Sequence, residues 1–151
     1  RLEKRGDVAG ALRGEAAPSA PGGGGNFATY ATSKSANVLF SRELAARRSD
    51  VASVAVTPGM VNTRLGRWHP LFALSWPLRR LLLPTPEQGC ASVVAAATAD
   101  AVVSGEYYGI DRETRELQRL EPSPASRDPE TARALWDATL RWAGVSLPPK
   151  E

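Results

Sequence analysis

The chain has 151 residues, of which 42% are hydrophobic and 23% charged, an ordinary composition for one globular domain that can bury a core. Its formal charge is +3 and its sequence pI about 9.4, yet no basic run is interleaved with aromatic residues, which argues against nucleic-acid binding. A single cysteine, Cys90, excludes a disulfide within the chain and a multi-cysteine zinc site, and we expect it to be a small buried apolar residue.

Residues 1–27 alternate charged residues with Ala, Gly and Pro, show no regular periodicity, and are predicted to be an irregular lead-in that ends in a Gly-rich linker. The chain begins with Arg1, nothing near it resembles a signal peptide, and no apolar stretch is long enough to span a bilayer. We therefore expect the sequence to be a fragment of a longer protein.

The next two segments predict a helix and then a strand. From Ala28 to Arg48 the pattern is helical, with one stripe formed by Ala36, Leu39, Phe40, Glu43 and Leu44. The segment Val51–Val56 is β-branched and nearly all apolar, which is typical of a strand buried on both faces. A helix followed directly by a buried strand is half of a βαβ unit, so we expect a parallel sheet.

Three further elements follow a hydrophobic, proline-punctuated segment over residues 62–85. A helix is predicted from Pro86 to about Ala99, with Thr85 as its N-cap. Gly105–Ile110 is predicted to be a short strand, and residues 128–143 a last amphipathic helix that Gly144 ends. Residues 146–151 are left as a tail.

Tyr30 and Lys34 are the first candidates for chemistry. They lie four residues apart in the predicted helix, a spacing that places both side chains on one helix face. A free phenol has a pKa of about 10, and a nearby ammonium lowers the pKa of a phenol toward neutral pH. Such a pair suits general acid–base catalysis, although the spacing also occurs by chance in unrelated proteins.

Two other patterns are weaker. Gly23–Ala28 fits Gly-x-Gly-x-x-Ala and has Asp50 about twenty residues further on, as a dinucleotide-binding loop would. Such a loop follows a hydrophobic strand, and the Pro-containing segment before it cannot form one, so we reject this interpretation. The only histidine, His69, lies in an apolar loop with no nucleophile pattern nearby, which favours packing over catalysis.

The segment Pro58-Gly59-Met60-Val61-Asn62-Thr63 is more informative. It follows the carboxyl end of the predicted buried strand, where ligands bind in open α/β sheets. Gly59 permits close approach of the backbone to a ligand, and Thr63 supplies a hydroxyl just beyond. An ordinary strand-ending turn is the alternative when the segment is considered alone.

Taken together, Tyr30-x-x-x-Lys34, the run from Ala36 to Leu44 and the Pro58–Thr63 segment closely resemble the C-terminal half of the short-chain dehydrogenase/reductases. Within that superfamily the sequence resembles the retinol dehydrogenase-like group and its "dehydrogenase/reductase family member" relatives, including the X-linked one. The resemblance runs from about Phe27 to Gly144 and includes Glu87-Gln88-Gly89, Gly105-x-Tyr107-Tyr108 and the run from Glu130 to Trp136.

The resemblance implies a role for each matching residue. Tyr30 would exchange a proton with the substrate oxygen while a hydride moves to or from the nicotinamide of NAD or NADP, and it would also count among the cofactor-binding residues. Lys34 would favour the ionised form of that phenol and hydrogen-bond the nicotinamide ribose. Pro58, Gly59, Met60 and Val61 would wall the nicotinamide, and Thr63 would reach toward its carboxamide or the phosphates.

The resemblance also implies a fold, and it implies which part of that fold this sequence does not contain. We expect an α/β fold, the C-terminal portion of a doubly wound, Rossmann-like parallel sheet, over residues 28–145, with the N-terminal dinucleotide-binding half missing. The family's substrate-polarising serine precedes its tyrosine at a strand end, and Ser19, the nearest upstream candidate, lies in a Gly/Pro-rich stretch. We therefore expect the active-site serine and asparagine upstream of Arg1.

Residues 62–85 occupy the place of the family's substrate lid, and the tryptophans and leucines of this loop suit a lipophilic substrate. Core packing and a peripheral membrane contact, with Arg79 and Arg80 facing the headgroups, are alternatives.

The family's tyrosine-bearing helix often packs against its twin, so a homodimer is also expected. A cytoplasmic location or association with the endoplasmic reticulum membrane is favoured.

The leading hypothesis is an NAD(P)-dependent oxidoreductase, present as a fragment, that interconverts a lipophilic alcohol of the retinoid or steroid kind and its carbonyl compound. The alternative is a catalytically inactive relative, or a truncated product, that acts through partner binding. Under either hypothesis we expect the isolated 151 residues to be inactive and marginally folded.

Overall fold

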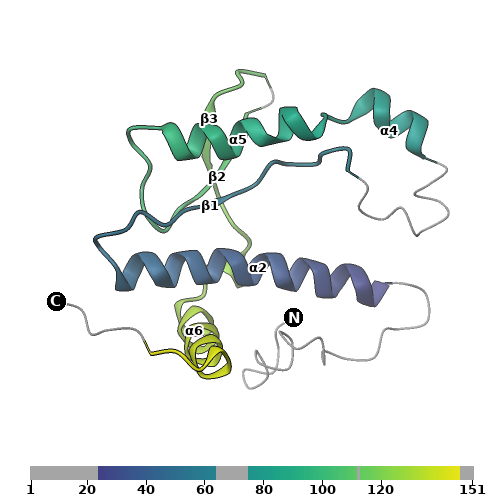
Figure 1. The fold of residues 1–151 in the computed structure, drawn as a ribbon. Coiled ribbons are helices and arrows are strands. Elements are labelled where there is room, and N and C mark those ends of the chain that lie inside the picture. Colours follow the sequence, from purple (N-terminus) through teal and green to yellow (C-terminus); the bar gives the residue numbers. More distant parts are fainter. Residues whose placement is uncertain (1–23, 64–74, 112, 147–151) are drawn as a thin grey trace. The chain divides into compact units, whose positions relative to one another are not determined.

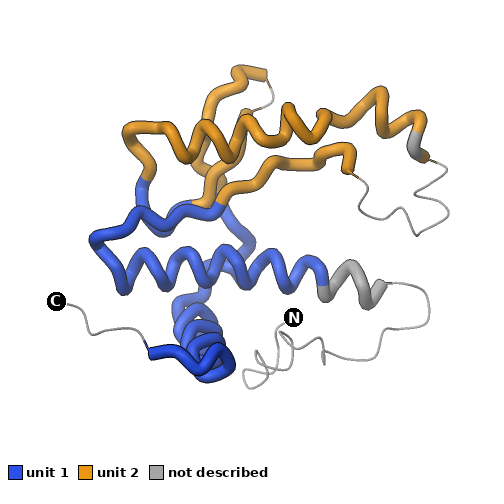
Figure 2. Tube along the Cα trace, viewed as in Figure 1, with its two compact units in different colours: residues 1–55, 103–106, 121–151 blue, residues 56–102, 107–120 orange. Residues whose placement is uncertain are grey.

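A computed structural model describes residues 24–63, 75–111 and 113–146 (Figure 1). The predicted lead-in up to residue 23, Ser19, His69, the middle of the predicted lid and the end of the tail lie outside these ranges. The chain forms two compact units (Figure 2): unit 1 comprises residues 1–55, 103–106 and 121–151, and unit 2 comprises residues 56–102 and 107–120.

Unit 1 is built on two helices that pack together, α2 (Gly24–Arg47) and α6 (Pro129–Ala143). The short 3-10 helix η1 (Pro124–Ser126) precedes α6 and also packs on α2. Leu39 of α2 is buried with Ala132 and Leu135 of α6, and Ala36 packs against this cluster. The predicted apolar stripe of the first helix is therefore the face that α6 covers.

Both ends of α6 follow the sequence signals. The carboxylate of Asp128 accepts hydrogen bonds from the backbone N–H groups of Glu130 and Thr131, both at 3.3 Å, and so caps the helix N-terminus. Gly144 has a left-handed backbone, with φ of 65°, and its N–H bonds back to the last turn. The predicted last helix and its end at Gly144 are confirmed.

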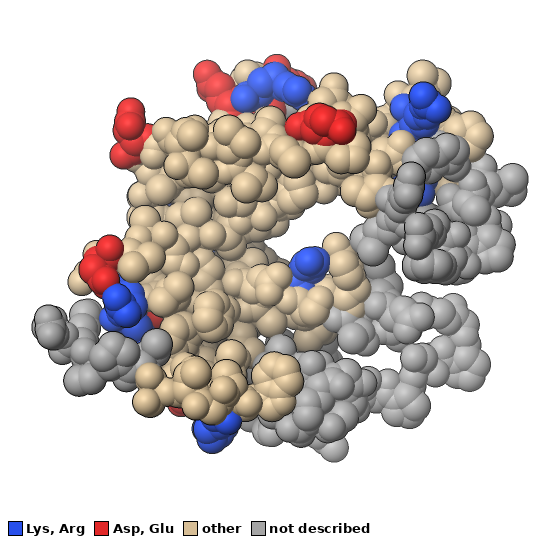
Figure 3. Space-filling model, in the orientation of Figure 1, with Lys and Arg blue, Asp and Glu red and all other residues tan. Residues whose placement is uncertain are grey.

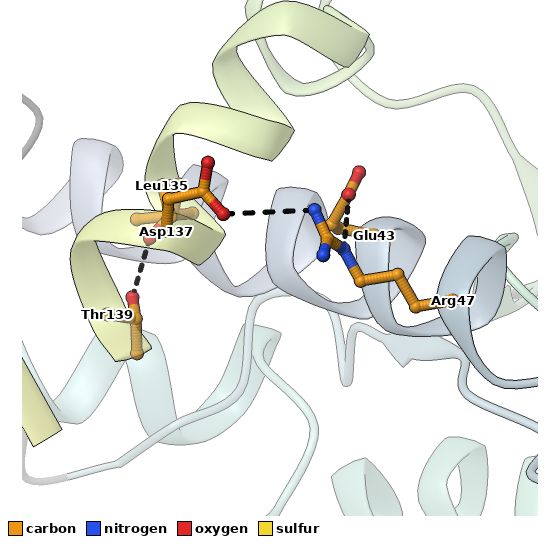
Figure 4. A network of polar contacts seen from close by, with 5 residues as sticks. All are labelled: Glu43, Arg47, Leu135, Asp137 and Thr139. Carbon is orange, nitrogen blue, oxygen red and sulfur yellow. Dashed lines mark hydrogen bonds and ion pairs between the residues drawn. The ribbon is translucent and has the colours of Figure 1, made fainter. Parts of the chain in front are cut away.

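A charged network joins α2 to α6 beside the buried cluster (Figure 4). The Arg47 guanidinium lies 2.7 Å from a carboxylate oxygen of Glu43 and 3.8 Å from one of Asp137. It also lies over the ring of Trp136, 5.3 Å from the ring centroid. Glu43 is the one charged member of the predicted stripe, and this residue is only 8% exposed. The pairing with Arg47 offsets the cost of burying its carboxylate.

The sheet has three strands in the order β1 (Ala55–Val56), β2 (Tyr107–Ile110) and β3 (Leu117–Leu120). The N–H of Ala55 donates to the carbonyl of Glu106, and the N–H of Thr57 to that of Tyr108, so β1 and β2 run parallel. Strands β2 and β3 are antiparallel. The α/β class is confirmed and β1 and β2 form a parallel pair, as predicted, but the antiparallel β3 makes the sheet of the described residues a mixed one.

The antiparallel strand follows from a turn that the sequence analysis did not identify. The Asp111 side chain accepts hydrogen bonds from the N–H groups of Glu113 and Thr114, both at 2.8 Å, and Arg115 adopts a positive φ of 62°. This local turn reverses the chain and returns it beside β2. The lowered pKa of the Asp111 carboxyl has the same cause, because those backbone N–H groups stabilise its charged form.

The first strand differs from its prediction. The ladder covers only Ala55–Val56, both half-buried, and Val51 is 44% exposed. Pairing with the neighbouring segment begins at Ser53, whose carbonyl accepts from the N–H of Gly105 at 2.7 Å. Residues before Ser53 therefore lie beyond the ladder, and β1 is an edge strand among the described residues. The prediction of a strand that begins at Val51 and is buried on both faces is therefore wrong in its length and in its burial.

Unit 2 also contains the helices α4 (Trp76–Leu82) and α5 (Pro86–Thr98). The predicted helix from Pro86 is confirmed, and its N-terminus carries a capping box: Thr85 Oγ1 accepts from the Gln88 N–H, and Gln88 Oε1 accepts from the Thr85 N–H. Helix α4 lies inside the segment predicted as a lid. No helix in the described parts of the chain is both long and apolar enough to cross a bilayer.

Candidate active site

Tyr30 and Lys34 lie one turn apart on α2, as the spacing predicts. The ammonium of Lys34 lies over the ring of Tyr30, 5.3 Å from the ring centroid. Both side chains are exposed, Tyr30 to 42%. The Ser33 hydroxyl donates to the Tyr30 carbonyl at 2.7 Å, a local contact that leaves the phenol accessible. The structure therefore brings the two predicted catalytic side chains together on a solvent-facing surface of the helix.

The Pro58–Thr63 turn begins where β1 ends. Gly59 has a φ of 71°, a left-handed conformation that only glycine adopts without strain, and its N–H donates to Thr57 Oγ1 at 3.1 Å. A Cβ built on Gly59 would meet no atom of the described residues within 4 Å, so this side of the turn is open with respect to them. Met60 next to it is 65% exposed. The first half of the turn is therefore an accessible backbone surface.

The second half of the turn is anchored to the helices of unit 2. The N–H of Asn62 donates to the Pro84 carbonyl at 2.9 Å, just before α5 begins. The carbonyl of Thr63 accepts a hydrogen bond from Arg79 of α4 at 3.2 Å. Within the described residues, the buried Asn62 Oδ1 atom has no hydrogen-bond partner. An unpaired buried acceptor is costly, so this atom is a candidate contact for a bound group that carries an N–H.

Gly89 of α5 is a residue of this region that the sequence analysis did not assign. It is buried, and a Cβ built on it would lie 2.6 Å from Cγ2 of Val61 and 3.5 Å from Cβ of Pro58. Its helix therefore packs directly against the turn. The available signal was a glycine near the start of a predicted helix, because such a glycine often marks a close approach of another segment.

The predicted site residues thus fall into two groups. Tyr30 and Lys34 belong to unit 1, and the turn from Pro58 to Thr63 belongs to unit 2. Each group is assembled by local structure, the first by one helical turn and the second by the end of β1 and the start of α5.

Asp50, the acidic residue of the rejected dinucleotide-loop pattern, is already engaged. Arg48 donates to both of its carboxylate oxygens, at 2.7 and 2.6 Å, just after α2. This bidentate contact lowers the pKa of Asp50 to about 2. A local ion pair accounts for this residue, which agrees with the rejection of the glycine-rich segment as a dinucleotide loop.

Cys90 is exposed, so its prediction as a buried apolar residue is wrong. The buried face of α5 passes through Gly89, Ser92 and Ala96, and the next residue along a helix is rotated by about 100° away from such a face.

No group of three or more potential metal ligands occurs among the described residues. On the face drawn in Figure 3, described charges of both signs are scattered and form no broad basic area.

The curated relatives of the chain identify its family, although no protein-family model matches it. It is 34% identical over 120 residues to human retinol dehydrogenase 12, a match that covers 77% of this chain and 36% of that protein. It is 38% identical over 125 residues to human retinol dehydrogenase 14, covering 77% and 35% of the two chains. It is 36% identical over 123 residues to bovine dehydrogenase/reductase SDR family member 13, covering 77% and 31%.

The chain thus spans about a third of the length of these relatives. Identity at this level over three quarters of the chain, in several relatives of one group, agrees with the resemblance carried by Tyr30, Lys34 and the Pro58–Thr63 turn. The chain belongs to the retinol dehydrogenase-like group of the short-chain dehydrogenase/reductase superfamily.

Proposed function

We propose that this chain carries the acid–base residues and part of the cofactor site of an NAD(P)-dependent oxidoreductase that interconverts a lipophilic alcohol and its carbonyl compound. The observation that carries the proposal is the Lys34 ammonium over the Tyr30 ring on an exposed helix face. The names of the relatives support an oxidoreductase of the retinoid kind. The fold proposed with it is the C-terminal portion of a doubly wound sheet.

Each residue has a role in the proposed reaction. During oxidation, the hydroxyl proton of the alcohol passes to the Tyr30 oxygen while a hydride leaves the carbinol carbon, and the reverse transfers occur in reduction. Bound nicotinamide supplies the acceptor or donor of that hydride. Lys34 supplies positive charge beside the phenol and a donor for the ribose hydroxyls. NAD and NADP both remain candidates.

The turn in unit 2 is the surface on which we propose that the nicotinamide lies. Its open side at Gly59 leaves space for a planar ring to approach the backbone between Pro58 and Val61. The unpaired Asn62 Oδ1 atom would accept a hydrogen bond from a carboxamide –NH2, and Thr63 would reach the carboxamide or the phosphates. The family's glycine-rich dinucleotide loop would lie outside the residues that the structure describes.

The proposed substrate is lipophilic because α4 presents exposed leucines in the predicted lid segment. Leu78, Leu81 and Leu82 are 60%, 82% and 67% exposed. These side chains suit a lid that closes over an apolar substrate, and the same surface suits a peripheral membrane contact near the headgroups. A homodimer through α2 is proposed on the resemblance alone.

The exposed leucines also favour the second candidate, a catalytically inactive relative that acts through partner binding, because a large apolar surface is typical of interaction sites. The two candidate functions differ in whether they require a bound cofactor. The oxidoreductase requires nicotinamide binding by the natural full-length protein, whereas the inactive relative requires none.

The experiment titrates NADH and NADPH separately into the full-length protein and into the 151-residue chain, with nicotinamide fluorescence as the signal. Turnover is then measured with a retinoid and a steroid alcohol. We expect saturable binding and turnover for the full-length protein and neither for the 151-residue chain. A full-length protein that binds neither nucleotide would contradict the oxidoreductase and support the inactive relative.

A further inference from the structure

Helix α5 approaches the Pro58–Thr63 turn closely at Gly89, which has no side chain. A Cβ built on Gly89 would lie 2.6 Å from Val61 Cγ2 and 3.2 Å from Val61 Cγ1. Real Cβ atoms essentially never approach so closely, so any other residue at position 89 would have to displace its neighbour. Valine is stiff about its only side-chain torsion, and both of its methyl groups are involved.

Helix α5 is held firmly at this point. Its capping box fixes Thr85 and Gln88, and Pro86 occupies the first helical position. The N–H of Gly89 donates to the Thr85 carbonyl at 2.9 Å, and the Gly89 carbonyl accepts from the buried Ser92 hydroxyl at 3.1 Å. A side chain at position 89 would therefore move the turn rather than the helix.

The second half of the turn is bonded to the segments around α4 and α5. The Asn62 N–H donates to the Pro84 carbonyl, and the Thr63 carbonyl accepts from Arg79. The first half of the turn approaches α5 through Pro58 and Val61, the two residues that a Cβ on Gly89 would meet. We therefore infer that this packing on α5 helps to position the backbone between Pro58 and Val61.

We propose that Gly89 is a positioning residue: by lacking a side chain it sets how close Val61 and Pro58 lie to α5, and so fixes the surface on which the nicotinamide rests. This inference rests on the proposed function, because it concerns the same cofactor surface. Gly89 touches neither cofactor nor substrate and acts through Val61.

The test substitutes Gly89→Ala in the full-length protein and measures kcat and KM for the nicotinamide cofactor at saturating alcohol. If the displaced turn weakens binding of the cofactor equally in the ground state and the transition state, KM rises and kcat does not. We expect KM to rise by about ten- to a hundredfold, that is by about 1.4 to 3 kcal/mol of binding free energy, while kcat at saturating cofactor changes by less than about threefold. An unchanged KM would overturn the proposal.

A second substitution tests whether the effect passes through Val61. Val61→Ala removes both methyl groups that the new Cβ would meet. We expect the double variant Val61→Ala/Gly89→Ala to have a KM within about threefold of Val61→Ala alone, because the two positions are coupled by direct contact. A double variant as impaired as Gly89→Ala would contradict the inference. If the single variant Gly89→Ala does not fold, the double variant still tests the proposal. The proposal then requires the double variant to fold and to bind the cofactor as well as Val61→Ala does.

Ala96→Val is the matched control, because Ala96 is also buried on α5 but lies about two turns further along the helix. It is expected to lower stability without raising KM for the cofactor. Equal rises in KM for both variants would mean general damage to α5 and would overturn the proposal. A failure of the proposed function is distinguishable, because in that case the unsubstituted protein itself shows no cofactor-dependent turnover.

Discussion

The exposed carboxylate of Asp50 illustrates how a local partner changes the interpretation of a residue. By spacing alone it matches the acidic residue of a dinucleotide-loop pattern, whereas the structure pairs both of its oxygens with Arg48. The pKa of Asp50 falls from its ordinary 3.8 to about 2 because that contact stabilises the ionised form. A lowered carboxyl pKa contributes stability above pH 3.8, and this contribution is lost as pH falls toward 2.

We therefore predict that the Asp50 carboxyl titrates with a midpoint near 2 in the folded chain and that Arg48→Gln moves the midpoint up toward 3.8. Carbon-detected NMR of the side-chain carboxyl over an acid titration measures both midpoints. Equal midpoints for Asp50 with and without Arg48 would show that the contact is absent in solution. The effect on stability is expected to be small, because both side chains are exposed and screened.

The site residues that the sequence predicts are those whose geometry is local. Tyr30 and Lys34 are neighbours because a helix brings positions four apart together, and Gly59 can be recognised because the turn needs its positive φ. The contact between Gly89 and Val61 joins residues 28 positions apart, counted from 61 to 89. No local rule predicts such a contact, because it depends on how α5 packs on the turn.

At the scale of elements, α5 and α6 were predicted accurately because their ends carry chemical signals. Thr85 and Pro86 open one helix, and Asp128 and Gly144 bound the other. Helix α2 begins at Gly24, four residues before its predicted start, because glycine's low helix propensity hides this first turn. Strand β3 was missed since two of its four residues are exposed and polar, so it has no apolar run to detect.

The N-cap of α6 gives a prediction at this scale. Asp128→Ala leaves the N–H groups of Glu130 and Thr131 without their acceptor, and we expect the free energy of unfolding to fall by about 1 kcal/mol. Urea unfolding followed by circular dichroism measures the change.

Asp137→Ala is the matched control for the cap, because it removes the same side chain from the same helix. Asp137 contributes only an exposed ion pair with Arg47, 3.8 Å away, and we expect its removal to cost less than about 0.5 kcal/mol. Losses of equal size in the two variants would show that the Asp128 contacts do not cap the helix.

At the scale of the whole molecule, the described residues bury little apolar surface. Seven apolar side chains are buried, several of them alanines, while twelve large hydrophobic residues are exposed. This imbalance supports the expectation that the isolated 151 residues are marginally folded, which stays a prediction, as do the domain bounds at 28 and 145. The exposed residues lie in both units, so the surfaces available for substrate, membrane or a second copy of the chain are not confined to one of them.

The central claim is that the full-length protein transfers a proton through Tyr30 while it transfers a hydride to or from a nicotinamide. Tyr30→Phe removes the phenolic oxygen and keeps the ring under the Lys34 ammonium. Tyr107→Phe makes the same change on β2, outside both groups of site residues.

The decisive measurement is turnover with a lipophilic alcohol, together with the cofactor dissociation constant, in these two variants of the full-length protein. General acid–base catalysis contributes about a hundred- to ten-thousandfold, so we expect Tyr30→Phe to lose at least about a hundredfold in kcat. The cofactor dissociation constant should stay within about threefold, because the phenolic oxygen acts on the substrate. Tyr107→Phe should retain turnover. Turnover retained by Tyr30→Phe would contradict the account.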